Sequence, residues 1–213
     1  MKSLMKKFFL FFFFVLSISL HAQENRASFG VRGGFGYSNI TNPGYFHSRY
    51  SYKTNAQVGI FSEVKLAGRF FLQAELLVSN PGTRLYQINS AGYKTSDSIF
   101  SFNCLQLPIE VKVKTNGDKI KGYYMTGVAP SYLINANLKY KVDSNATFYQ
   151  YTPYENRLTA NLVNTAGIEV DIGRQFTPFI DFRYMQGLTN VHKIRVARLQ
   201  TNLQFLLCVG VRF

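Results

Sequence analysis

The sequence predicts an all-β protein: an eight-stranded antiparallel up-and-down transmembrane β-barrel with short periplasmic turns and long extracellular loops. Three observations predict this fold class. Long segments alternate between apolar and polar residues, their connectors alternate between short and long, and the last segment runs to a terminal Phe213. Period-two alternation indicates a strand with two different faces. Strands of about ten residues with short turns on one side only are typical of outer-membrane barrels.

The first 22 residues are predicted to be an export signal. Three lysines precede a Phe-rich apolar stretch over residues 8–20, and Ala22 is a small residue at a plausible cleavage point. A membrane-spanning helix needs about 20 apolar residues, so an N-terminal anchor is the less favoured alternative. We therefore expect a signal peptide over residues 1–22 and a β-barrel domain over residues 23–213.

The first four predicted strands place their apolar residues at alternate positions. They cover residues 27–37, 57–66, 69–79 and 100–114. Glycines occupy one face of the first strand, which indicates curvature or close backbone approach. Ala67-Gly68 provides a tight turn between the second and third strands, and Asn80-Pro81-Gly82 ends the third. Pro108 cannot donate a ladder hydrogen bond, so we expect a bulge or gap within the fourth strand.

The other four predicted strands show the same pattern with two irregularities. They cover residues 121–135, 157–172, 175–185 and 199–213. The fifth strand has aromatic and small residues on both faces, so the sequence does not decide which face points into the barrel. Asn164 interrupts the apolar face of the sixth strand. Asn116-Gly117-Asp118 and Gly173-Arg174 are turn signals that leave short connectors before the fifth and seventh strands.

Charge and cysteine content narrow the class of protein further. Without the three signal lysines, 21 Lys and Arg remain against 11 Asp and Glu, a net charge of about +10. Behind an export signal this excess favours an anionic surface such as lipopolysaccharide or another acidic glycan over nucleic acid, although it could simply keep loops solvated. Cys104 and Cys208 are predicted to be free thiols because the topology places them toward opposite membrane faces.

If the apolar face meets lipid, the opposite face lines the barrel. Lys or Arg on the lipid face would cost about 2–4 kcal/mol near the midplane, so the two faces cannot be exchanged. An eight-stranded barrel is just wide enough for side chains to fill. We therefore predict a packed ion-pair network and no open pore, in preference to a proton or ion path. The predicted interior residues are Arg32, Glu63, Lys65, Glu75, Glu110, Lys112, Glu169, Asp171, Asp181, Arg183 and Arg212.

Aromatic residues gather near the predicted strand ends, where membrane interfaces should lie. Girdles of aromatic residues at both interfaces are expected of outer-membrane barrels. The residues are Phe29, Phe70, Phe176 and Phe213 at the periplasmic ends and Tyr37 and Tyr184 at the outer ends.

The sequence carries little sign of an active site. The two histidines of the mature chain, His47 and His192, fall in predicted outer loops, and no HExxH, GxSxG or CxxC pattern occurs. We predict no catalytic residue, no cofactor and no metal site. A lipid-modifying enzyme of the outer membrane remains the competing class.

The mature chain resembles the porin-family outer-membrane β-barrel domain grouped with the PorT-like proteins. The resemblance rests on GVRGGFGYSNI, FFLQAELLVSNPG, LQLPIEVKVK, GIEVDIGRQFTPFIDFRYMQGLTNV and the closing LQFLLCVGVRF. It implies residence in the outer membrane of a Gram-negative bacterium, usually without enzymatic activity, and some relatives are tied to a protein-secretion machinery. It also implies that the barrel-assembly machinery reads a C-terminal signal, with Phe205, Val209, Val211 and Phe213 at the signal positions.

Three functional hypotheses follow. The leading one is a non-enzymatic structural or surface-interaction barrel with basic, Tyr-rich outer loops and a filled polar interior. The others are an outer-membrane lipid-modifying enzyme and an accessory barrel of a secretion or uptake complex. Expected partners are outer-membrane lipid, lipopolysaccharide and the barrel-assembly machinery, and no nucleic acid.

Overall fold

The computed structural model describes residues 27–41, 48–88, 94–142, 145–150, 156–172, 176–190 and 201–213. The predicted signal peptide, His47 and His192 lie outside these residues. The strands of the described part are β1 (Ala27–Ile40), β2 (Ser48–Ser51), β3 (Lys53–Ala67), β4 (Phe70–Ser79), β5 (Gly82–Ile88), β6 (Lys94–Gln106), β7 (Ile109–Lys114), β8 (Ile120–Val142), β9 (Asn145–Gln150), β10 (Leu158–Val170), β11 (Thr177–Gly187) and β12 (Asn202–Arg212). In this part of the chain, no helix has the length and apolar character needed to cross a bilayer.

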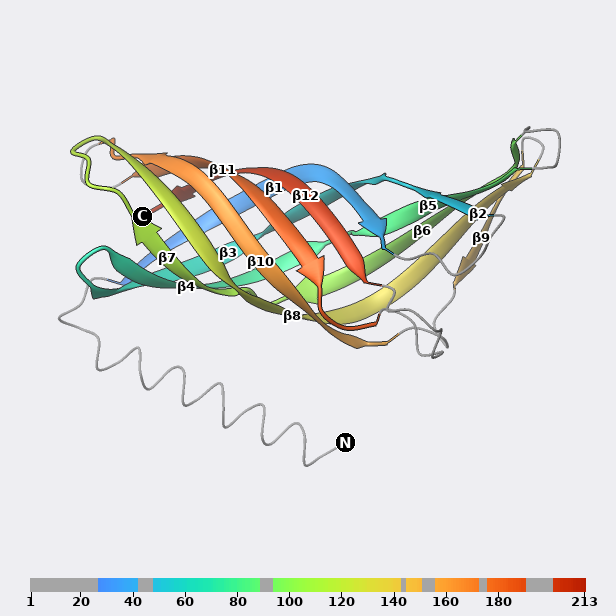
Figure 1. The fold of residues 1–213 in the computed structure, drawn as a ribbon, viewed down its shortest axis with the longest axis horizontal. Helices are drawn as coiled ribbons and strands as arrows, with labels where there is room; N and C mark the ends of the chain where they lie inside the picture. Colours follow the sequence, from blue (N-terminus) through green and yellow to red (C-terminus); the bar gives the residue numbers. More distant parts are fainter. Residues whose placement is uncertain are drawn as a thin grey trace, which may run out of the picture.

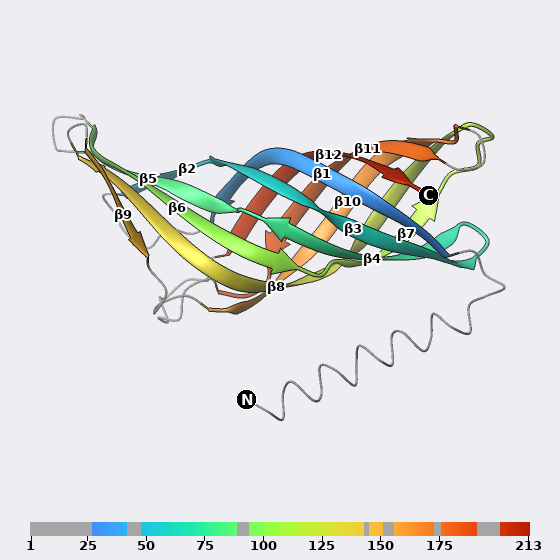
Figure 2. The ribbon, with the colours of Figure 1, turned by 180° about the vertical axis from the view of Figure 1, so that it is seen from behind.

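Eight strands close into an antiparallel barrel (Figures 1 and 2). Around the ring the order is β1, β3, β4, β7, β8, β10, β11 and β12. The last strand then pairs with the first, from Gly30 opposite Arg212 to Ile40 opposite Asn202. Closure leaves no unpaired strand edge in the ring, which confirms the predicted fold class.

The short connectors lie together at the end of the barrel that holds Phe213, here called the turn end. Gly68, between β3 and β4, has a φ of 51°, a conformation that favours glycine. The opposite end is called the loop end, and it receives the long connections. This alternation of connector lengths matches the pattern that the sequence predicts.

Short interruptions separate consecutive strands at three places in the described part of the chain, and one of them divides the strand predicted over residues 100–114. β3 is separated from β2 at Tyr52, β5 from β4 at Asn80 and Pro81, and β7 from β6 at Leu107 and Pro108. The predicted break at Pro108 is therefore confirmed. Pairing continues beside it, because the Leu107 amide donates to the carbonyl of Pro130 at 2.9 Å.

One side of the barrel extends far beyond the rest at the loop end (Figure 1). β2, β5, β6, the second half of β8 and β9 pair there as a five-stranded antiparallel sheet, here called the extended wall. The sequence predicts polar loops over residues 38–55, 80–97 and 136–157, and for much of their length this is wrong. A strand that is exposed to water on both faces does not need alternating apolar residues. The sequence of such a strand therefore does not distinguish it from a loop.

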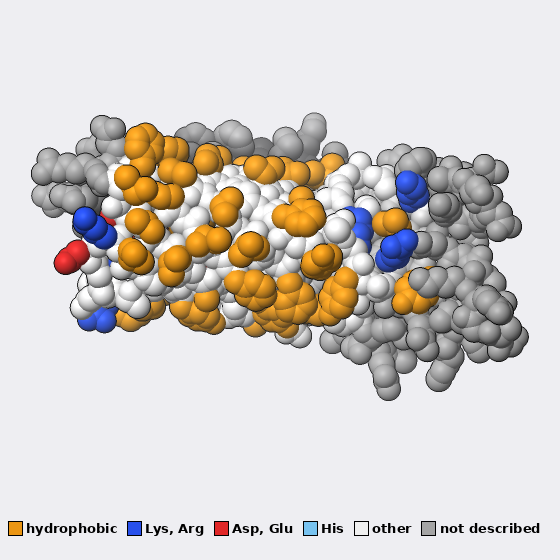
Figure 3. Space-filling view, turned by 90° about the horizontal axis from the view of Figure 1, so that it is seen from above, with side chains coloured by type: hydrophobic (Ala, Val, Ile, Leu, Met, Phe, Trp, Pro, Cys, Tyr) orange, Lys and Arg blue, Asp and Glu red, His pale blue; other side chains and the backbone are white. Residues whose placement is uncertain are grey.

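Apolar side chains cover the outside of the barrel, and Lys and Arg lie beyond this band toward both ends (Figure 3). Along β12, Leu207 and Val209 are each 57% exposed, whereas Leu206 and Cys208 are fully buried. The structure also resolves the facing of β8, since Tyr123 and Met125 point inward while Tyr124 and Val128 are exposed. The alternation is therefore inverted relative to a soluble barrel, whose apolar face points inward.

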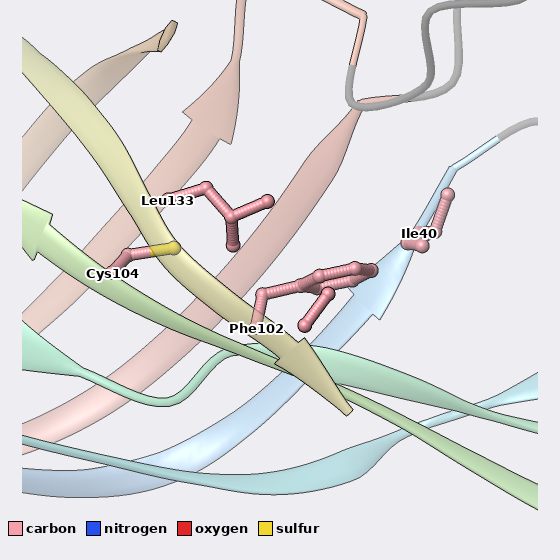
Figure 4. Close-up of a cluster of buried hydrophobic side chains, with 5 residues drawn as sticks. Ile40, Phe102, Cys104 and Leu133 are labelled. Atoms are coloured by element: carbon pink, nitrogen blue, oxygen red, sulfur yellow. The ribbon is translucent and has the colours of Figure 1, made fainter. Parts of the chain in front are cut away.

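Two apolar clusters fill the barrel interior toward the loop end. The first contains Ala129, Val163, Met185, Leu206 and Cys208. The second lies near the loop end and contains Ile40, Phe102, Cys104, Leu133 and Ala136 (Figure 4). Both cysteines are buried and free, as the sequence predicts.

Candidate functional site

The middle of the barrel holds a cluster of charged side chains from four strands, here called the central cluster. It consists of Arg32 of β1, Glu75 of β4, Glu110 of β7, and Asp181 and Arg183 of β11. Arg32 lies 2.6 Å from Glu75 and 2.7 Å from Asp181. Arg183 lies 2.8 Å from Glu75 and 2.7 Å from Glu110. These ion pairs cross the lumen and tie opposite parts of the barrel together.

Neutral donors complete the central cluster, in which two guanidinium groups face three carboxylates. The Tyr123 hydroxyl donates to Asp181 at 2.7 Å, and the Thr165 hydroxyl donates to Glu110 at 3.1 Å. The Gln73 amide donates to Glu75 at 2.6 Å. Buried charges are tolerable only when they are paired and hydrogen-bonded, so these donors belong to the cluster as much as the arginines do.

A second group of charges lies toward the turn end, here called the turn-end cluster. It contains Glu63, Lys112, Lys114, Glu169 and Arg212. Both lysines contact both glutamates, at distances from 2.7 Å to 3.2 Å. Arg212 lies 2.9 Å from Glu63 and 3.4 Å from Glu169. Each carboxylate is therefore shared by three cations.

The turn-end cluster reaches the edge of the barrel through Asp171, which is only partly buried. Its carboxylate lies 2.6 Å from Lys121 and 3.6 Å from Arg212. Lys114 and Lys121 are absent from the predicted interior set. Lys114 is two residues from Lys112, so the alternation that places Lys112 inside would also have identified Lys114. Lys121 belongs to the strand for which the sequence did not decide the inward face.

Aromatic rings lie between the charges, a feature that the sequence does not reveal. The Lys112 ammonium lies 4.0 Å from the centroid of the Tyr123 ring, and the Arg32 guanidinium lies 5.6 Å from that of Phe179. Phe61 packs edge-on against Phe179 with centroids 5.7 Å apart. The packed rings and charged side chains, joined by cation–π and edge-to-face contacts, occupy this part of the lumen. Gly30 leaves room for this layer, since a Cβ there would lie 2.2 Å from the Phe61 ring.

One predicted interior residue lies elsewhere. Lys65 is exposed, and its assignment to the interior is corrected. It is two residues from the end of β3, where the register against β4 shifts between Lys65 and Ala67. The strand end therefore no longer follows the alternation of the barrel. The remaining predicted residues lie in the central cluster, in the turn-end cluster or, for Asp171, beside it.

A small pocket opens near the loop end. Its lining residues are Phe102, Cys104, Leu133, Asn156, Thr159, Asn161, Thr189 and Asn202. Three of them, Phe102, Cys104 and Leu133, belong to the apolar cluster of Figure 4. Among the described residues, no group of three or more His, Cys, Asp or Glu side chains could hold a metal ion.

A closed barrel with an apolar exterior and a filled, charged interior defines an integral β-barrel membrane protein. The chain belongs to the family described as outer membrane protein beta-barrel domain, whose model matches residues 21–193. The protein is therefore an integral β-barrel of the bacterial outer membrane. No curated protein sequence matches the chain.

Solved outer-membrane barrels are similar to this chain at low sequence identity. OprG of Pseudomonas aeruginosa is 13% identical with a TM-score of 0.51, over 89% of this chain and 97% of that chain. Neisserial surface protein A is 11% identical with a TM-score of 0.49, over 88% and 97%. The attachment invasion locus protein Ail of Yersinia pestis is 14% identical with a TM-score of 0.43, over 88% and 99%.

Membrane residence orients the molecule. Short turns of such barrels face the periplasm and longer loops face outward, so the turn end is periplasmic and the extended wall is extracellular. Phe29, Phe70, Phe176 and Phe213 are all more than half exposed at strand ends on the periplasmic side. This placement suits rings that anchor a barrel at the interface.

The four residues of the predicted assembly signal lie along the outward row of β12. Val209 and Phe213 are clearly exposed, and Phe205 and Val211 are partly exposed. The backbone amide of Phe213 donates to the carbonyl of Phe29 at 2.7 Å, and its ring packs edge-on against Phe176. Phe213 therefore lies at the seam between the first and last strands. Recognition of this row by the assembly machinery stays a prediction.

Proposed function

We propose that this protein is a non-enzymatic barrel without a pore, whose interactions are made by the extended wall outside the cell. The observation that carries the proposal is the central cluster, whose five charged side chains are buried and paired across the lumen. An ion passing through the barrel would have to separate these pairs and displace the apolar clusters beyond them. The filled lumen supports a function at the surface of the protein.

Conductance measurements test the absence of a pore. The purified protein in a planar bilayer is expected to give no large, steady single-channel conductance, because the central cluster and the aromatic rings fill an eight-stranded lumen. A known porin inserted under the same conditions is the positive control. Steady openings that persist across preparations would contradict the proposal.

The extended wall carries basic residues on one of its faces, here called the basic row. Arg84 of β5 pairs with Ile99 of β6, and Ile99 pairs with Lys139 of β8, so the three residues lie on one face of the sheet. Arg84 and Lys139 are exposed. Two strand spacings of about 4.8 Å place their backbones about 10 Å apart. The net positive charge and this row favour the anionic groups of lipopolysaccharide or a similar acidic glycan.

Removing the basic row should weaken lipopolysaccharide binding. In nanodiscs of zwitterionic lipid, the Arg84→Gln, Lys139→Gln double variant is expected to bind added lipopolysaccharide severalfold more weakly than the unchanged protein at low salt. The difference should shrink at high salt, which screens exposed charges. The matched control is Lys65→Gln with Lys119→Gln, which removes two exposed lysines at the periplasmic end. Equal losses in both double variants would reject the extended wall as the binding surface.

A further inference from the structure

We propose that the lipid-facing side of β8, β10 and β11 is a contact surface for a second copy of this chain within the membrane, centred on Asn164. This inference depends on residence in the membrane and not on the role of the extended wall. It begins from a polar group in the apolar exterior of the barrel.

Asn164 lies on the outward row of β10, between exposed apolar residues. Leu158 near the outer end of this row is 68% exposed, and Ile168 toward the periplasmic end is 47% exposed. The Tyr124 hydroxyl donates to the Asn164 Oδ1 atom at 2.6 Å, and the Thr126 hydroxyl donates to the same atom at 3.0 Å. The Asn164 oxygen is therefore satisfied, while its amide nitrogen has no hydrogen-bond partner among the described residues.

The depth of Asn164 makes this unused nitrogen significant. Asn164 lies six positions after Leu158 and eight positions before Ile172, which are the exposed ends of the row. The amide therefore lies near the middle of the apolar band. Hydrocarbon supplies no hydrogen-bond acceptor, so polar groups at this depth need a protein partner.

The surroundings of Asn164 differ from the rest of the exterior. Its cross-strand neighbour on β11 is Tyr184, whose hydroxyl donates to Gln186 at 3.1 Å and extends the polar patch. Ala166 is the next outward residue along β10 and is small, and it pairs with Tyr124 of β8 and Phe182 of β11. Small and polar residues together are typical of helix contact surfaces inside membranes, where they allow close approach and hydrogen bonding.

The opposite part of the exterior carries mainly large apolar side chains, with Gly33 and Ser62 as small residues among them. The outward positions of β12, β1 and β3 include Phe35, Val58, Ile60, Leu207 and Val209, all exposed by 47% or more. Large apolar side chains of this kind suit contact with lipid tails. Ser62 on β3 is a small polar residue on this side and provides a matched control.

Symmetry selects a second copy as the partner. Two barrels inserted in the same direction can be related by a two-fold axis along the membrane normal, and a residue beside that axis then meets its own copy at the same depth. The Asn164 oxygen already accepts two hydrogen bonds, but the hydroxyl oxygens of Tyr124 and Thr126 can still accept one. The unused amide N–H of one copy can therefore donate to a hydroxyl of the other, so the patch holds both the donor and the acceptor that a second copy needs.

Disulfide cross-linking tests the geometry. In a Cys104→Ala, Cys208→Ala background reconstituted in vesicles, Thr126→Cys is expected to form a disulfide-linked dimer on mild oxidation. Val58→Cys on the opposite side should stay monomeric under the same conditions. A dimer formed only through Val58→Cys, or equally through both, would overturn the proposal, as would a monomer in both cases.

Fluorescence resonance energy transfer between copies tests the role of the Asn164 amide. The copies carry donor and acceptor dyes at Lys119→Cys in the same cysteine-free background. Asn164→Leu is expected to raise the dissociation constant of the dimer about tenfold, the size expected for losing a polar contact inside a membrane. Ser62→Ala should leave it unchanged. Heat-modifiable mobility on a gel shows that each variant folds. Equal dissociation constants for the two folded variants, or no dimer of the unchanged chain, would overturn the proposal. Either failure leaves the conductance and lipopolysaccharide predictions untouched.

Discussion

Replacing Arg183 with methionine is expected to lower the free energy of unfolding of the barrel by about 3–5 kcal/mol, the usual effect of removing one partner from a buried ion pair. The Arg183 side chain is fully buried and contacts Glu75 and Glu110 at 2.7–2.8 Å. Without it, the three carboxylates of Glu75, Glu110 and Asp181 would share the middle of the lumen with the single guanidinium of Arg32. The loss arises from uncompensated buried charge, since methionine preserves most of the packing volume.

Urea titration of the barrel folded into vesicles measures this change. Lys65→Met is the matched control, because it removes an exposed cation from the same barrel and should change the free energy of unfolding by at most about 0.5 kcal/mol. Adding Glu110→Gln to Arg183→Met should recover part of the loss, since it removes one unpaired carboxylate. If Arg183→Met were as stable as Lys65→Met, the central cluster would not be the stabilising element inferred here.

Deletion of Phe213 is expected to reduce the amount of folded barrel in the outer membrane severalfold. The deletion removes the backbone hydrogen bond to Phe29 and the ring contact with Phe176 at the seam where β12 meets β1. It also removes the terminal aromatic of the predicted assembly signal. Closing the ring requires the last strand to pair with the first, so damage at this seam affects the whole fold.

The heat-modifiable fraction of the protein in isolated membranes measures assembly. Phe213→Tyr keeps an aromatic ring at the last position and should insert normally. It therefore shows whether the loss of the ring, and not any change at position 213, causes the defect. Removing residues 89–93, between β5 and β6, should have a smaller effect because it leaves the seam intact. Normal insertion of the chain without Phe213 would argue against both the assembly signal and the proposed importance of the seam.

The sequence by itself determined the barrel, because lipid imposes one simple requirement on every outward position. An exposed polar side chain in hydrocarbon is costly, so each membrane strand must alternate with period two. That requirement places Val209 outside and Cys208 inside, and it places Arg32 and Glu75 in the lumen. The turn at Gly68 and the strand break at Pro108 are equally local, since both depend on the backbone chemistry of one residue.

The tertiary structure alone decided which interior groups meet and what stands above the membrane. Alternation assigns a residue to a face but does not say which strands lie opposite across a lumen, so the contacts of Arg183, 108 residues from Glu75, could not be read from it. The facing of β8 and the inward rings of Phe61 and Phe179 required the closed ring. The extended wall also lay beyond prediction, because water satisfies either face of a strand there and removes the alternation that lipid enforces.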